Sequence, residues 1–152
     1  MLREMYNFLR PADKINEMQY GKQEQILGDM VSAFIHEMDW HCNDNGERYI
    51  LEGVALDLRR LVKECDPEKF VIVALGFCDI DPNEKLADMK KHETEKQWTY
   101  KFTDPEKLCF IKSGIEQSKR TKKIAEDLGV KYFDTSSDRD LTIAKAAKYL
   151  AK

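Results

Sequence analysis

The most constraining feature of the sequence is an uninterrupted apolar run at residues 70–75, Phe-Val-Ile-Val-Ala-Leu. The run is rich in β-branched residues, which favour strands. Because it does not alternate with polar residues, it is typical of a strand buried on both faces of a parallel sheet. Parallel strands need long crossover connections, usually helices, so the run predicts an α/β protein.

The rest of the chain alternates between helical and strand character. Residues 48–51 and 130–133 have the composition of two further short strands, and six helices are predicted at residues 1–10, 22–42, 58–65, 82–96, 105–128 and 140–150. Asp81-Pro82 and Asp104-Pro105 are helix starts, and Gly129 is a helix stop. We therefore predict an α/β fold of three layers, with helices flanking a small parallel sheet, in a single domain of residues 1–152.

Charge and hydropathy limit the class of protein. A net charge of −3 and a pI near 5.7 argue against a dedicated nucleic-acid binder. The longest apolar run is far shorter than the roughly 20 residues of a membrane span. The charged N-terminal residues 1–10 lack a signal-peptide core. We expect a cytoplasmic protein with neither a membrane nor a nucleic acid as partner.

The cysteine spacing gives no sign of a metal site. The chain has four cysteines, none in a CxxC pair: Cys42, Cys65, Cys78 and Cys109. Most lie in or beside apolar segments, where a thiol acts as a small buried hydrophobe in a reducing compartment. His36 and His41 are five residues apart, a spacing that turns them to different faces of a helix. We therefore expect no bound metal at these residues.

Polar side chains follow each of the three predicted strands. Ligands of open parallel sheets bind at the carboxyl ends of the strands, where a carboxylate can hold Mg²⁺ or act as a base. We expect Glu52, Asp79 and the loop Thr135–Ser137 to share one rim. Two alternatives stay open: Glu52 is an exposed carboxylate at a helix entry, and Ser136 and Ser137 cap the last helix.

The predicted helix at residues 105–128 has a polar middle on its apolar stripe. Leu108, Ile111 and Ile115 lead to Ser118 and Thr121 before the stripe becomes apolar again. Such a face suits a helix that lines a polar ligand pocket, where the neighbouring Lys119 or Arg120 can reach a phosphate. The alternative is an ordinary amphipathic helix with small polar residues at its edge.

Four segments together resemble P-loop small-molecule kinases, in particular the group of 2-phosphoglycerate kinase-like enzymes. Residues 49–54 (Tyr-Ile-Leu-Glu-Gly-Val) resemble a strand-Glu-Gly-Val segment of that class, and residues 115–120 and 129–136 are similar to its lid-to-last-strand segment. Leu2-Arg3-Glu4 looks like the start of the helix after its second strand. The segments occur in the family's order along most of the chain.

The resemblance implies a role for each matched position. Glu52 would lie near Mg²⁺ and the acceptor, with Arg3 and Asp79 on the substrate side. Residues 90–101 would match the mobile lid. Arg120, with Lys119, would contact phosphate. The Thr135-Ser136-Ser137 loop would lie near the nucleotide base, with Thr135 and Ser136 as its binding residues.

The sequence departs from the family at the phosphate-binding loop. None of its seven glycines opens a GxxxxGK[ST] motif, whose backbone N–H groups and lysine hold the phosphates. The chain therefore looks like such a kinase without its first third, including a central strand. We expect ATP- and Mg²⁺-dependent phosphorylation of a small molecule only if that loop is supplied elsewhere, and a homodimer or a partner chain that completes the sheet. The alternatives are a non-catalytic binding or assembly module and an unrelated α/β enzyme.

Overall fold

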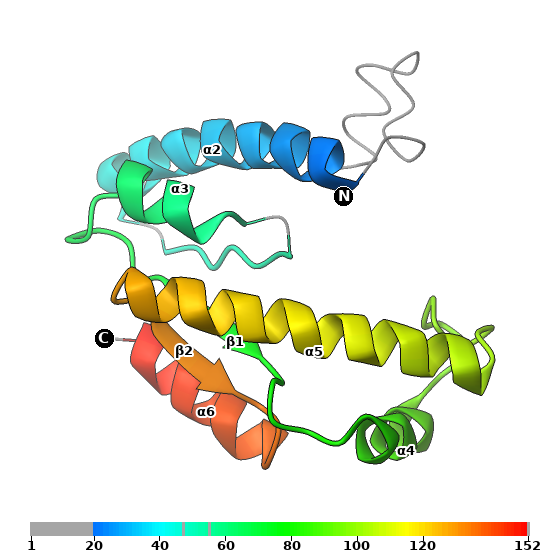
Figure 1. Cartoon of the computed structure of the whole chain (residues 1–152). Coiled ribbons are helices and arrows are strands. Elements are labelled where there is room, and N and C mark those ends of the chain that lie inside the picture. Colours follow the sequence, from blue (N-terminus) through cyan, green and yellow to red (C-terminus); the bar gives the residue numbers. More distant parts are fainter. Residues whose placement is uncertain (1–19, 47, 55, 152) are drawn as a thin grey trace. The chain divides into compact units, whose positions relative to one another are not determined.

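The computed structural model describes residues 20–46, 48–54 and 56–151 of the chain. The predicted helix at residues 1–10 lies outside them. The chain divides into two compact units, of which the first ends at Phe70 and the second begins at Val71. In the described residues the first unit is helical, and the second combines helices with a sheet (Figure 1).

The first unit contains two of the predicted helices, α2 (Tyr20–Asn45) and α3 (Leu58–Glu64). The apolar stripe of α2 is buried at Leu27, Val31 and Ile35, a spacing of four residues that brings side chains to one face of a helix. Both helices are confirmed.

The predicted strand at residues 48–51 is wrong. These residues have no regular structure, and Ile50 is 84% exposed. A short apolar segment becomes a strand only where a neighbour completes its backbone hydrogen bonds. No described residue pairs with it, so the described sheet has two strands instead of three.

The second unit contains the sheet, in which β1 (Val73–Gly76) and β2 (Lys131–Asp134) run parallel. In the register Gly76 lies opposite Asp134, so both strands end at the same edge. The α/β class with a small parallel sheet is thereby confirmed. However, β1 begins later than the predicted 70–75 strand, and only Ala74 in it is buried while Leu75 is 48% exposed. One neighbouring strand leaves the other edge of β1 without a described partner.

Three helices accompany the sheet: α4 (Pro82–His92), α5 (Asp104–Asp127) and α6 (Arg139–Leu150). The crossover from β1 to β2 consists of α4 and α5. Ile111 and Ile115 of α5 are buried, and α5 contacts both strands. In Figure 1, β2 lies between α5 and α6.

Local capping sets the helix ends. Asp81 caps α4 as predicted, with its carboxylate accepting hydrogen bonds from the N–H groups of Asn83 and Glu84. The N-cap of α5 is Thr103, one residue before the predicted Asp104-Pro105 start. Asp138 caps α6, so the alternative that assigned this cap to the preceding serines is wrong.

The segment that the resemblance matches to a lid, residues 90–101, includes the end of α4 and a series of turns. Directly after α4, Glu93 forms an ion pair of 2.7 Å with Lys107 of α5, and the two side chains are at most 9% exposed. Thr99 is buried beside Glu93 and donates to its second carboxylate oxygen at 3.5 Å. The connection is therefore fastened to α5 by buried polar contacts.

Among the described residues, no helix combines the length and the apolar composition that a membrane crossing requires.

Candidate functional site

The candidate site lies at the carboxyl edge of the two-stranded sheet. The backbone N–H and the hydroxyl of Thr135 both donate to the carbonyl oxygen of Gly76, at 2.8 and 3.0 Å. Ser136, the residue after Thr135, accepts a hydrogen bond of 2.9 Å at its Oγ from the N–H of Asp79. The loops that follow β1 and β2 are thus fastened to one another, and three of the predicted rim residues come together as expected.

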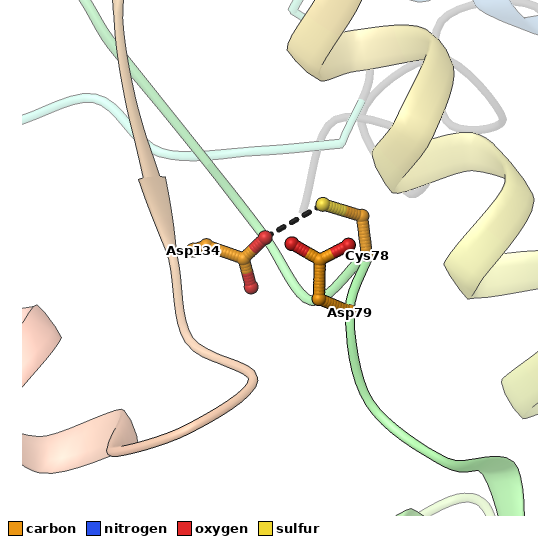
Figure 2. Close-up of side chains that lie close together, drawn as sticks. All are labelled: Cys78, Asp79 and Asp134. Carbon is orange, nitrogen blue, oxygen red and sulfur yellow. Dashed lines mark hydrogen bonds between the residues drawn. The ribbon is translucent and has the colours of Figure 1, made fainter.

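Three side chains at this edge form a compact acidic cluster, which Figure 2 shows. Cys78 and Asp79 follow β1, and Asp134 ends β2. One sulfur or oxygen atom from each lies within 4.8 Å of the others. The thiol of Cys78 donates a hydrogen bond of 2.6 Å to Oδ2 of Asp134. Cys78 is buried, while the side chain of Asp79 is 71% exposed, so the cluster opens to solvent on one side.

Ser136 holds the second oxygen of Asp134. Its backbone N–H donates to Oδ1 at 2.9 Å, and its hydroxyl donates to the same atom. Burial acts to raise the pKa of Asp134, but the hydrogen bonds from Cys78 and Ser136 outweigh it and lower the pKa. The carboxylate is therefore charged and fixed in orientation. Burial, followed by the bond to Asp134, raises the pKa of the Cys78 thiol, which keeps it protonated.

A lysine of α5 balances part of this negative charge. Nζ of Lys122 lies 3.6 Å from Oδ2 of Asp79. The neighbouring acidic groups, Cys78 and Asp79, raise the pKa of Lys122. The cluster is a place where a positive group is favoured.

The polar middle of α5 faces the sheet at this point. Ser118, which is 7% exposed, accepts a hydrogen bond of 3.2 Å from the N–H of Phe77. The hydroxyl of Tyr132 is buried beside it without a hydrogen bond in the described structure. Both side chains press against Gly76, where a Cβ atom would lie 2.2 Å from the Tyr132 hydroxyl oxygen and 2.9 Å from Ser118. Only glycine leaves room for them.

Of the remaining predicted site residues, two are on α5, one is in the first unit and one is outside the described residues. Lys119 and Arg120 are exposed on α5, and Lys119 forms an ion pair of 2.9 Å with Glu116. Glu52 belongs to the first unit, exposed in a segment without regular structure instead of at a strand end. Arg3 lies outside the described residues.

The sequence interpretation assigned no site role to Cys78, Asp134, Tyr132 or Lys122. One signal was available for Lys122, because it lies four residues after Ser118 and therefore on the same face of α5. Nothing local marks Cys78 or Tyr132, whose neighbours come from the other strand.

The chemistry that this site offers is that of a partly buried, oriented pair of carboxylates with a thiol and an ammonium group. Such a set can hold a cation or orient a polar ligand at the rim. In a comparison with known proteins, no family model, curated protein or solved structure matches the chain.

Proposed function

We propose that the chain is part of a P-loop kinase-like phosphotransferase of three-layered architecture, which transfers phosphate from ATP, with Mg²⁺, to a small molecule in the cytoplasm. The chain has no GxxxxGK[ST] motif, so transfer requires a phosphate-binding loop from a preceding segment or from another chain. Phosphoryl transfer depends mainly on positioning and charge neutralisation, which that loop provides.

The observation that carries the proposal is the junction of the two strand ends. Asp79 donates its N–H to Ser136 at 2.9 Å, and the resemblance assigns these residues to the substrate and the base side of the cleft. Parallel strands with a helical crossover bind ligands at this edge. The polar face of α5 supports the same interpretation because Ser118 is directed at the strand end.

The open edge of β1 supports the requirement for a further strand. A parallel sheet of two strands is small for this fold class, and beside β1 the apolar side chains of Val71 and Leu75 are 47% and 48% exposed. A strand that precedes a phosphate-binding loop would cover this edge and bring the loop to the rim. The same edge also favours the second candidate, a non-catalytic module that assembles through strand addition, as a homodimer or with another chain.

Calorimetric titration with Mg·ATP tests the proposal in two proteins. One is the chain itself, for which we expect no heat of binding up to millimolar nucleotide. The other is the chain extended at its N-terminus by a strand, a GxxxxGK[ST] loop and a helix, for which we expect saturable binding. Ser136→Ala in the extended protein should weaken binding, while Ser137→Ala, one residue further and exposed, is the matched control.

Two results would decide against a kinase-like function. The first is an extended protein that folds but does not bind Mg·ATP. The second is binding that responds equally to the two serine substitutions, because the strand-end junction would then have no part in it. If the chain alone forms concentration-dependent oligomers and never binds nucleotide, the assembly module is the better description.

A further inference from the structure

The cluster of Cys78, Asp79 and Asp134 combines two kinds of metal ligand. It offers one sulfur and two carboxylate oxygens, from segments 56 residues apart in the chain, within 4.8 Å of one another. Oδ1 of Asp134 is engaged by Ser136, which leaves Oδ2 directed at the thiol (Figure 2). Outer hydrogen bonds of this kind orient the ligating atom in metal sites.

The donor chemistry selects the class of cation. Mg²⁺ and Ca²⁺ prefer oxygen ligands alone, whereas Zn²⁺ accepts cysteine sulfur together with carboxylate oxygen. We propose that the Cys78–Asp79–Asp134 cluster is a binding site for a divalent cation of the zinc class, with Sγ of Cys78 and one oxygen of each aspartate as its protein ligands. This inference does not depend on the proposed function.

A second observation indicates that the cluster binds an ion or a water molecule. The hydroxyl oxygen of Tyr132 is completely buried and has no hydrogen-bond partner in the described part of the chain. It lies against the Cys78 thiol and Ser118. A buried hydroxyl without a hydrogen-bond partner is unfavourable, and such groups often indicate an ion or a water molecule in native proteins. A cation with its water ligands would supply the partner.

Two changes accompany binding. The Cys78 thiol loses its proton to solvent, because the thiolate is the ligand, and the cation takes the proton's place between sulfur and Oδ2 of Asp134. Lys122, now 3.6 Å from Asp79 and 38% exposed, gives up that contact and turns to solvent. Lys119 also faces this negative potential but is paired with Glu116. Lys122 is therefore the main positive competitor of the cation.

Titration of the reduced full-length chain with Co²⁺ tests the site without nucleotide. We expect one equivalent of Co²⁺ to produce a thiolate-to-cobalt charge-transfer absorption, and Zn²⁺ to abolish it by displacement. Zn²⁺ should also raise the midpoint of thermal unfolding of the second unit, because a ligand that binds only the folded state stabilises it.

Substitutions distinguish Co²⁺ binding at this cluster from Co²⁺ binding at other cysteines. Cys78→Ser should abolish the absorption band, and the exposed Asp79→Asn, which has little reason to disturb folding, should weaken Co²⁺ binding by more than about tenfold. Cys109→Ser is the matched control, because Cys109 is a free and exposed cysteine outside the cluster, and it should leave the band unchanged. Lys122→Met should tighten binding by removing the competing charge.

The proposal fails if the folded wild-type chain gives no band with millimolar Co²⁺, or if Cys109→Ser removes the band and Cys78→Ser does not. It also fails if Asp79→Asn binds Co²⁺ as tightly as the wild type. None of these outcomes bears on whether the extended chain binds Mg·ATP, so the failure of one proposal is distinguishable from the failure of the other.

Discussion

Replacement of Gly76 by alanine is the most direct test of how the strand end is packed. An alanine Cβ at this position would lie 2.2 Å from the Tyr132 hydroxyl oxygen and 2.9 Å from Cβ and Oγ of Ser118. Well-packed carbon atoms prefer separations of about 3.5 to 4.0 Å. Neither neighbour can retreat easily, since Tyr132 lies in β2 and Ser118 is buried in α5.

The expected loss of stability follows from two opposing effects. Overpacking in a close-packed site costs about 1 to 3 kcal/mol. Replacing a flexible glycine within a regular element recovers about 0.5 to 1 kcal/mol. We therefore expect Gly76→Ala to lower the free energy of unfolding of the second unit by about 1 to 2 kcal/mol, and to lower its unfolding midpoint by about 5 to 15 °C, as for domains of 60 to 100 residues.

The assay uses a tryptophan of the second unit. The chain has two tryptophans, and in a Trp40→Phe background only Trp98 reports. Trp98 packs edge-to-face against Phe102 and Phe110, with ring centroids 5.3 and 5.0 Å apart, so its emission should change when the second unit unfolds. Urea unfolding followed at Trp98 then gives the stability of this unit alone.

A double substitution and a control make the reasoning refutable. Tyr132→Phe removes the oxygen that a Cβ at position 76 would meet first, so it should restore part of the stability that Gly76→Ala loses. Gly53→Ala is the control, because its Cβ would only touch Leu56 at 3.9 Å. A Gly76→Ala protein as stable as the wild type, or a double variant no more stable than Gly76→Ala, would show that the strand end is not packed in this way.

The remaining predictions concern helix glycines, the buried ion pair and acid stability. Gly28→Ala in α2 should stabilise the first unit by about 0.5 to 1 kcal/mol, because the new Cβ has room. Gly114→Ala in α5 should destabilise the second unit by about 1 to 2 kcal/mol, because the new Cβ would lie 2.8 Å from the Phe77 ring. Thermal unfolding of both variants checks this contrast. Lys107→Met should cost about 3 to 5 kcal/mol by leaving the Glu93 carboxylate buried and unpaired, and Glu93→Leu added to it should recover most of that loss in urea unfolding. The pKa of Asp134 is lowered in the folded state, so its contribution is present above the ordinary aspartate pKa and is lost as pH falls through the native value. Asp134→Asn should therefore flatten the acid limb of a stability profile, and an unchanged limb would contradict this.

Several helix boundaries could be predicted from the sequence because their causes are local, although α4 ends at His92 and not at residue 96 as predicted. The Asp81 cap lies beside the proline that starts α4, and Gly129, with a φ of 70°, follows the last turn of α5. These contacts span only a few residues, so the residue types at neighbouring positions determine them. The parallel pairing of β1 and β2 was predictable for a related reason, since a helical crossover between two apolar segments allows little else.

The contacts at the rim could not be read from the chain in the same way. Cys78 meets Asp134 from 56 residues away, and the register that places Gly76 opposite Asp134 decides which side chains share the edge. A shift of one residue would turn each side chain of β2 to the other face of the sheet. The failed strand at residues 48–51 has the same origin, because strand formation depends on a partner that composition does not reveal.

Residue order alone therefore settled where most of the described helices begin, since those starts depend on interactions within a turn or two of backbone. The pairing register of the two strands and the packing of α5 decided which side chains meet at the edge of the sheet. They alone bring a thiol, two carboxylates and a lysine to one edge, because such contacts arise between segments whose separation in sequence exceeds the reach of any local signal.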